Sequence, residues 1–154
     1  MLKQTNSQGS QCSPRNTAHI LLTIYFSTTM CNLCDTDPKS HSFFKMGRQG
    51  GANMFYSCPG DATNHETNGV LAHYREVLEN NGGEKWIFIF DATGFTLYHS
   101  TRIASARGLL AIFNEYGDSL QEVRITNATS FAKTMFSAIR PFASAEIFKK
   151  IIWK

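Results

Sequence analysis

The sequence predicts an α/β fold for the clearly patterned part of the chain, which begins near residue 68. Residues 85–90 form a continuous apolar run, typical of a strand in a sheet that is covered on both faces. Segments with apolar residues at helical spacing lie before and after this run. A short strand-like segment, 122–126, and the apolar segment 151–153 follow such helical segments. Helix and strand patterns that alternate in this way indicate an α/β domain.

The composition fits one globular domain and excludes a disordered chain. The 154 residues are 42% hydrophobic and include twelve phenylalanines. A net charge of +3 is too small to indicate a nucleic-acid partner. From Gln121 onward, however, six basic residues stand against the two acids Glu122 and Glu146. This basic end favours transient contact with an anionic membrane surface, although a solvated face without a partner has the same composition.

Residues 1–67 are the poorly defined part of the sequence. Residues 18–30 are apolar, but they are too few to span a bilayer, which takes about 20 apolar residues. No cleavage site of the signal-peptide type follows them. Residues 35–68 contain prolines and glycines without a clean helical or strand period. We therefore expect no targeting signal and a cytoplasmic location.

Cys31 and Cys34 form a C-x-x-C pair, with His41 and His65 nearby in the sequence. A structural zinc site usually shows a second close-spaced pair of ligands, and the sequence shows none. A thioredoxin-type site needs a strand–helix frame, which the acidic, proline-containing segment after the pair does not supply. We therefore predict that the four cysteines of the sequence, Cys12, Cys31, Cys34 and Cys58, are reduced thiols, with no metal and no cofactor.

The first clear helix is expected to start at Asn68 as its N-cap and to end at the turn 80–83. The strand 85–90 follows. A second helix is expected after a cap at Ser100 or Thr101. The apolar faces of these two helices are, respectively, Val70, Leu71, Tyr74, Val77, Leu78 and Ile103, Ala106, Leu109, Leu110, Phe113, Tyr116.

Residues 116–119 predict a turn, and Glu122–Thr126 a short strand. A third helix is expected from residue 129 to residue 140, because Pro141 prevents its continuation. Ser144 can cap a last short helix, and residues 151–153 begin another strand.

Asp91, at the end of the apolar run 85–90, has two interpretations. The spacing of "FDATGFTL" is similar to the phosphoryl-transfer signature of the haloacid dehalogenase superfamily, in which an aspartate is the nucleophile. That reaction needs Mg²⁺ held by further carboxylates, and after Glu122 the sequence has only Glu146. We therefore favour a structural role, in which Asp91 accepts backbone N–H bonds in the turn that ends at Gly94.

A longer series of residues resembles the CRAL-TRIO lipid-binding domain family. Members carry an apolar strand ending in Asp-x-x-Gly, a helix leading to Tyr-Pro-Glu-x-Leu, and a strand ending in Asn-x-Pro. A phenylalanine-bearing helix, a basic residue before Pro-Phe, and Lys-Ile follow. The matching residues are Asp91, Gly94, Tyr116, Asp118, Leu120, Asn127, Phe131, Arg140, Pro141, Phe142, Lys150 and Ile151.

The resemblance has departures. Gly117 and Thr129 stand where the family has proline, and both keep a turn plausible. The family's final strand, helix and Leu-Pro-x-Glu-Tyr-Gly-Gly segment have no counterpart before Lys154. Residues 1–67 match neither the opening strands nor the N-terminal helical subdomain. We therefore expect residues 68–154 to form an incomplete CRAL-TRIO-like domain, with a mixed, mostly parallel sheet flanked by helices.

The resemblance implies a cytosolic carrier of a hydrophobic lipid, not an enzyme. Such a carrier needs a cavity wall with few polar atoms, and Arg140 is implied to contact a lipid headgroup. The same apolar residues would equally fill a solid core. A ligand-free protein-interaction domain and the phosphatase remain alternatives. The predicted lipid-binding residues are Ile87, Ile89, Ile125, Phe131, Met135, Ile139, Arg140 and Phe142.

The resemblance also bears on which lipid is carried. Carriers of phosphatidylinositol in this family place an acid in the long helix, about nine residues before the tyrosine that corresponds to Tyr116. That position is Arg107 here, a reversal of charge. A guanidinium has only hydrogen-bond donors and cannot accept bonds from inositol hydroxyls. We therefore expect a more apolar or differently headed lipid than phosphatidylinositol.

Overall fold

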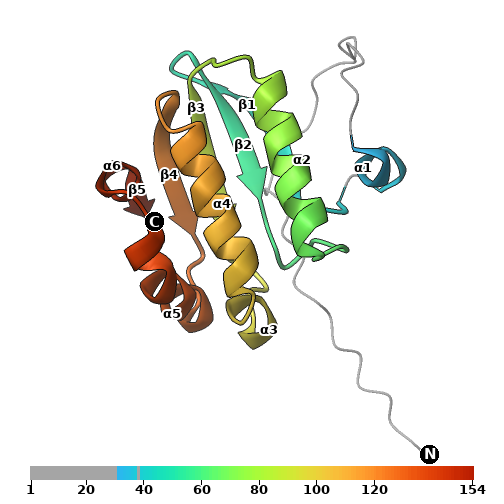
Figure 1. Ribbon diagram of the computed structural model, residues 1–154, viewed down its shortest axis with the longest axis vertical. Helices are drawn as coiled ribbons and strands as arrows, with labels where there is room; N and C mark the ends of the chain where they lie inside the picture. Colours follow the sequence, from blue (N-terminus) through green and yellow to red (C-terminus); the bar gives the residue numbers. More distant parts are fainter. Residues whose placement is uncertain (1–30, 38) are drawn as a thin grey trace, which may run out of the picture.

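The computed structural model describes residues 31–37 and 39–154, which form a five-stranded sheet and its helices (Figure 1). The apolar segment 18–30 lies outside these residues. In chain order the elements are α1 (Asn32–Thr36), β1 (Phe43–Gln49), β2 (Ala52–Ser57), α2 (Thr67–Asn80), β3 (Trp86–Asp91), α3 (Leu97–Ser100), α4 (Ile103–Glu115), β4 (Leu120–Thr126), α5 (Ser130–Ile139), η1 (Arg140–Phe142), α6 (Ala145–Lys149) and β5 (Ile151–Trp153).

The sheet has the strand order β1-β2-β3-β4-β5, so each strand is added beside the one before it. β1 is antiparallel to β2, and β2, β3, β4 and β5 are parallel. Right-handed crossovers that progress in one direction place their helices on one face of the sheet. Figure 1 shows α2 and α4 side by side on that face. This mixed, mostly parallel α/β architecture confirms the predicted fold class.

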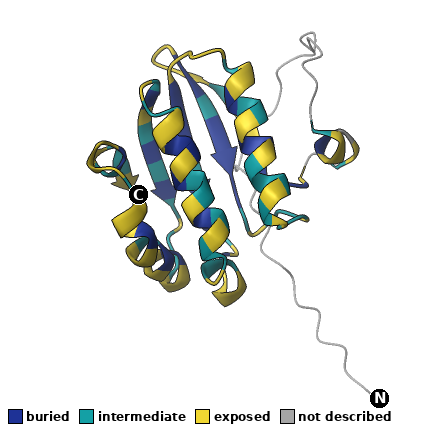
Figure 2. Ribbon diagram, in the orientation of Figure 1, coloured by how far each residue is buried: buried dark blue, intermediate teal, exposed yellow. Residues whose placement is uncertain are grey.

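The core lies between the sheet and these helices and is unusually aromatic. Along β3, Trp86, Phe88 and Phe90 point toward the helices, because alternate residues of a strand face the same side. Phe88 packs edge-to-face on Phe113 of α4, with ring centroids 4.9 Å apart. Phe43 of β1 stacks on Tyr74 of α2 at 3.8 Å. In Figure 2, α2 and α4 each carry buried residues on one side and exposed residues on the other.

The opposite face of the sheet carries the intervening residues of the strands. Ile87 and Ile89 of β3 lie on this face, in register with Met54 and Tyr56 of β2. In β4 the same face carries Arg124, whose guanidinium pairs with Glu122 at 2.5 Å. Towards the edges the face becomes exposed at Phe44 and Ile152.

The helix positions are close to those expected, but two caps differ. α2 starts with Glu66 as its N-cap rather than Asn68, and the Glu66 carboxylate accepts hydrogen bonds from the backbone N–H groups of Asn68 and Gly69. α4 begins at Ile103 and not after a cap at Ser100 or Thr101. Those two residues end the separate short helix α3, which sequence periodicity does not resolve.

The hairpin of β1 and β2 was not predicted, because residues 35–68 show no clean period. Two features explain this. A bulge between Lys45 and Gly47 interrupts the alternation in β1, and β2 is buried on both faces. Gly50 and Gly51 form the turn at φ values of 57° and 81°, the left-handed conformation that two-residue hairpin turns require. Within the described residues, no helix is long and apolar enough to cross a bilayer.

Two glycines let the loop after β2 touch the turn after β3. A Cβ atom on Gly60 would lie 2.3 Å from the carbonyl oxygen of Thr93 and 2.9 Å from the Cα atom of Gly94. Gly94 itself has a φ of 71°, which other residues adopt only at a cost. The two strand ends can approach this closely only because both positions are glycine.

We expect Gly60→Ala to destabilise the fold by about 3 kcal/mol, because the added methyl group meets backbone atoms that cannot rotate away. Gly51→Ala is the matched control, since nothing lies within 4 Å of its Cβ position and only its positive φ is penalised. Its cost should be about 1 kcal/mol. Chemical denaturation of both variants measures the difference, and equal costs would contradict the close approach.

Candidate functional site

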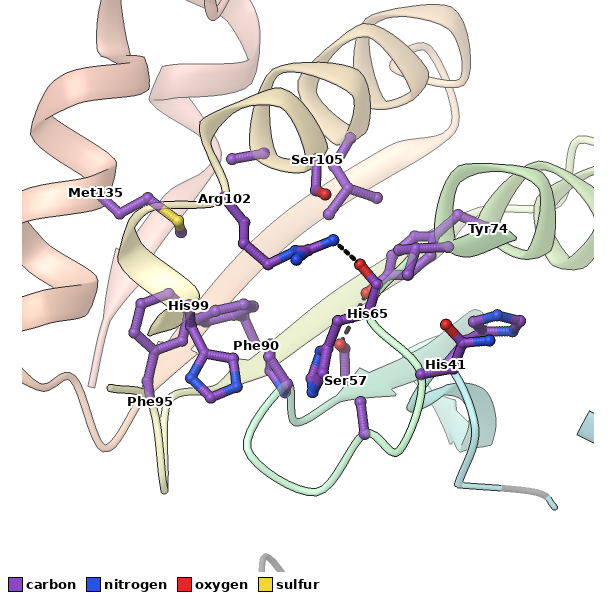
Figure 3. Close-up of a pocket in the computed structure, with 16 residues that line it drawn as sticks. His41, Ser57, His65, Tyr74, Phe90, Phe95, His99, Arg102, Ser105 and Met135 are labelled. Carbon is purple, nitrogen blue, oxygen red and sulfur yellow. Dashed lines mark hydrogen bonds between the residues drawn. The ribbon is translucent and has the colours of Figure 1, made fainter. Parts of the chain in front are cut away.

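A cavity lies at the carboxyl ends of β2 and β3, beneath α2 and α4 (Figure 3). In open α/β sheets, ligands bind outside the carboxyl ends of the strands. The cavity volume is about 90 Å³. Most of its lining residues come from the loop after β2 and from the later elements α2, β3, α3, α4 and α5. The full set is His41, Ser57, Pro59, Ala62, Asn64, His65, Val70, Tyr74, Phe90, Phe95, His99, Arg102, Ser105, Ala106, Leu109 and Met135.

The wall of this cavity is mostly apolar and includes Phe90 and Met135. His65, His99 and Arg102 lie close together in Figure 3. The Arg102 guanidinium donates a hydrogen bond to the His65 carbonyl oxygen, and so joins the start of α4 to the loop after β2. Burial, followed by the neighbouring positive charge, lowers the pKa of His65, and burial also lowers the pKa of His99. Both rings are therefore neutral at pH 7.

The Asp91 carboxylate beside this region is fully occupied by hydrogen bonds. One oxygen accepts from the backbone N–H of Thr93 at 2.9 Å, from the Thr93 hydroxyl at 2.7 Å and from the Asn127 amide at 3.0 Å. The other oxygen accepts from the Tyr56 hydroxyl at 2.8 Å. The bond to the Thr93 backbone confirms the turn-capping interaction expected from the sequence.

These bonds decide the charge of Asp91. Burial alone would raise the Asp91 pKa, but the hydrogen bonds from Asn127, Thr93 and Tyr56 outweigh burial and hold the pKa below its usual value. The carboxylate is therefore ionised but engaged on both oxygens. Among the described residues, no group of carboxylates around Asp91 is placed to hold a metal ion.

A different set of side chains does have the donors and the closeness to hold a metal. Cys31 and Cys34 are free thiols, as predicted, whereas Cys58 is disulfide-bonded, so the prediction of a reduced thiol is wrong there. The sulfur atoms of Cys31 and Cys34 lie near His41 and His73. His65, the other histidine near the pair in sequence, lines the cavity instead. Burial raises the pKa of the Cys34 thiol to about 11, so this thiol is not an activated nucleophile.

A second hollow, which we call the basic groove, lies between α5, α6 and the end of β5. Its volume is about 590 Å³. The Arg140 guanidinium lies 5.2 Å from the centre of the Phe148 ring, in a cation–π contact. The groove combines three cations with three aromatic rings, and its lining residues are Ala128, Lys133, Phe136, Ser137, Arg140, Phe148, Trp153 and Lys154.

The eight predicted lipid-binding residues lie in four different places. Ile87 and Ile89 face away from the cavity, on the other side of the sheet. Ile125, Met135 and Ile139 belong to the core beneath the helices, and of these Met135 lines the cavity.

Of the remaining three, Phe131 lies at the start of α5, and Arg140 and Phe142 lie just after its end. Arg140 lines the basic groove. Phe131 and Phe142 are 42% and 46% exposed. The Arg107 guanidinium lies 4.1 Å from the centre of the Phe142 ring in a cation–π contact, and both residues are exposed.

The sequence did not point to most of the cavity lining. In β3 the lining residue is Phe90, the strand neighbour of the predicted Ile89. The prediction chose the other residue because both alternating sets of this strand are apolar, and the sequence does not reveal which set faces the helices. His99 and Arg102 gave no sequence signal. They lie in α3 and just before α4, and the sequence did not show that the fold brings this turn to the cavity. The sequence did assign four lining residues to the apolar faces of predicted helices: Val70, Tyr74, Ala106 and Leu109. It gave no other signal for the cavity.

Fold and cavity together define an α/β domain of a ligand-binding class, with a mostly parallel sheet and an apolar hollow under its helices. The sequence model described as "CRAL/TRIO domain" matches residues 59–153, more than half of the chain. The chain therefore belongs to the CRAL/TRIO domain family, a family of lipid-binding and lipid-transfer proteins.

Comparison with solved structures supports the fold. The crystal structure of Sfh5 superposes with a TM-score of 0.64 at 10% sequence identity. The match covers 83% of this chain and 52% of Sfh5, so the chain spans about half the length of that protein. At this identity the likeness concerns the fold alone. Comparison with curated proteins gives no match.

The contacts of Asp91 predict a pH dependence of stability. A carboxylate whose pKa is lowered by folding stabilises the native state above its unfolded pKa of about 4, and this contribution is lost as the pH falls through the lower, folded pKa. At pH 7 we expect Asp91→Asn to cost about 1–3 kcal/mol of unfolding free energy. The difference from wild type should shrink below about pH 4.

Denaturation with urea at several pH values measures this difference. Asp118→Asn is the control, because Asp118 is an exposed acid on a turn. A cost for Asp91→Asn that does not change with pH would contradict the account of the Asp91 charge.

Proposed function

We propose that this chain binds one hydrophobic lipid in the space between the sheet and helices α2, α4 and α5, and carries it through the cytosol. The observation that supports this most strongly is the apolar cavity at the carboxyl ends of the strands, in a domain of the CRAL/TRIO family. Apolar walls suit a lipid, because every buried polar group without a partner costs about 1–3 kcal/mol.

The size of the cavity adds a condition to this proposal. Pockets that bury small ligands measure about 300–1,000 Å³, whereas this one measures about 90 Å³. Lipid binding therefore requires the space to widen. The hydrogen bond from Arg102 to the His65 carbonyl links two of the surrounding segments, so widening on that side would break this bond.

The basic groove supports a second part of the proposal, contact with an anionic membrane surface. Lys133, Arg140 and Lys154 provide positive charge, and aromatic rings such as Trp153 lie between them. Aromatic residues favour the membrane interface, and basic residues are attracted to anionic headgroups. We propose that the groove faces the membrane during lipid exchange.

The cargo that we propose is an apolar lipid such as tocopherol rather than phosphatidylinositol. The helix position that would hold an acid for inositol carries Arg107, and this guanidinium lies over the Phe142 ring. It cannot accept a hydrogen bond from an inositol hydroxyl.

We further propose that the chain is not an enzyme. Asp91 is engaged by four hydrogen bonds, and among the described residues it belongs to no group of three or more side chains placed to hold a metal ion. Mg²⁺-dependent phosphatase activity would overturn this part. A chain without lipid and without activity would indicate a protein-interaction domain.

A cavity-filling variant tests the cargo site. Ala106 lines the cavity and is buried, so Ala106→Leu should occupy the space needed by the lipid. We expect binding of fluorescent tocopherol to weaken at least about tenfold, the scale on which a tightly fitting pocket responds to added methyl groups.

Ala111→Leu is the matched control, since Ala111 is exposed on the same helix and the chemical change is identical. Thermal unfolding must first show that both variants are folded. Equal tocopherol binding by the two folded variants would place the lipid elsewhere.

Arg140→Ala tests the membrane surface. Loss of one cation near an anionic membrane costs about 1 kcal/mol, so binding to vesicles that contain phosphatidylinositol phosphate should fall about fivefold. Added salt should reduce this effect. Arg75→Ala on α2 removes the same charge outside the groove and should leave vesicle binding nearly unchanged. Equal losses for the two variants in a vesicle flotation assay would contradict the assignment.

A further inference from the structure

The C-x-x-C pair, for which the sequence predicts no metal, acquires two further metal-binding side chains through the fold. Cys31 and Cys34 lie at the start of the described chain, in and just before α1, and His41 precedes β1. His73 lies on α2, 39 residues after Cys34. One donor atom from each of the four residues lies within 4.8 Å of the other three. The second pair of ligands is therefore present in space, although it is absent from the local sequence.

The distances between the donor atoms suit a single tetrahedral ion. The Cys34 sulfur lies 3.4 Å from Nδ1 of His41 and 3.6 Å from Nδ1 of His73. The Cys31 sulfur lies 3.7 Å from Nδ1 of His41. With Zn–S bonds of about 2.3 Å and Zn–N bonds of about 2.0 Å, the edges of a tetrahedron measure roughly 3.3–3.8 Å. The three observed distances fall in this range.

The ring of His73 is oriented as in a metal ligand. Its Nε2 atom donates a hydrogen bond to the carbonyl oxygen of Phe43 at 2.7 Å, which leaves Nδ1 without a proton and facing Cys34. Metal-bound histidines almost always donate their second ring N–H in this way, and the bond fixes both the tautomer and the ring angle.

His41 provides an independent observation. Its side chain is 3% exposed, its Nδ1 atom faces both sulfurs, and its buried Nε2 atom has no hydrogen-bond partner. Nδ1 is therefore the ring nitrogen placed to bind a metal beside the two sulfurs, whereas Nε2 lacks the second hydrogen bond that His73 makes.

We propose that Cys31, Cys34, His41 and His73 bind one Zn²⁺ ion in a closed, structural site. Two thiolates and two imidazoles are a common tetrahedral ligand set for zinc, and the set leaves no position open for substrate. The ion would fasten the segment before β1 to α2. Because His41 also lines the cavity, the ion would fix one wall of the proposed lipid site. The zinc site itself does not depend on the proposed lipid function.

The first test is the metal content of the full chain, purified under reducing conditions after growth with zinc. We expect one zinc ion per chain by elemental mass spectrometry. Replacement by Co²⁺ should give the visible absorption and the sulfur-to-metal charge-transfer bands of tetrahedral thiolate coordination. A strong chelator should lower the unfolding temperature. A metal-free chain, or a Cys31–Cys34 disulfide in its place, would overturn the proposal.

Variants then identify the ligands. Cys34→Ser and His73→Gln should each weaken Zn²⁺ binding by at least about 100-fold, as measured by competition with a chelating dye. His65→Gln should keep the wild-type affinity, because His65 lies outside the cluster. Should Cys34→Ser fail to fold, the Co²⁺ spectrum of the wild-type chain still decides, since octahedral coordination without sulfur would contradict the site. Wild-type affinity in both folded ligand variants would also contradict it.

Discussion

The carboxylate of Asp91 joins the carboxyl ends of three neighbouring strands. It accepts hydrogen bonds from Tyr56 on β2, from Thr93 in the turn after β3, and from Asn127 after β4. Hydrogen bonds to an ionised group are roughly twice as strong as those between neutral groups. The aspartate that could have been a nucleophile therefore works as a fixed anchor. Its hydrogen bonds hold together the strand ends at the edge of the sheet where the cavity lies.

The space next to this anchor is shaped by aromatic packing. Phe88 and Phe113 fill the middle of the layer between the sheet and the helices, whereas the cavity begins near Phe90 and Phe95 at the end of the strands. Rings of this size leave little free volume, which explains why the cavity is small for a lipid carrier. A cargo must therefore displace side chains or helices, and protein interiors resist such changes unless they have a second stable arrangement.

The later part of the fold could be predicted from sequence because its signals are local. The apolar run of β3 and the apolar faces of α2 and α4 follow simple periods, and the turn at Asp91 uses ordinary turn chemistry. The hairpin β1–β2 was missed because a bulge at Lys45 and Gly47 breaks its alternation. The residue pattern of β3 also cannot show which of its two apolar faces meets the helices. Ile89 was therefore predicted as a lipid-binding residue, whereas Phe90 lines the cavity.

The Cys–His cluster was missed for a different physical reason. His73 lies 39 residues from Cys34, on a helix whose own pattern explains it as a buried residue. Long-range contacts of this kind follow from the tertiary fold, and no local spacing rule contains them. The basic groove was indicated in part, because Lys133, Arg140 and Lys154 belong to the basic end that the sequence shows. Their meeting with the rings of Phe148 and Trp153 follows from the fold.

The central claim is that the space between the sheet and its helices holds a lipid. Native mass spectrometry of the full chain, after gentle purification and again after incubation with vesicles, tests this most directly. We expect a chain that carries one additional mass, which dissociates on activation and is identified as a single lipid. A chain that retains only its own mass, or its mass with a metal ion, under both conditions would contradict the claim.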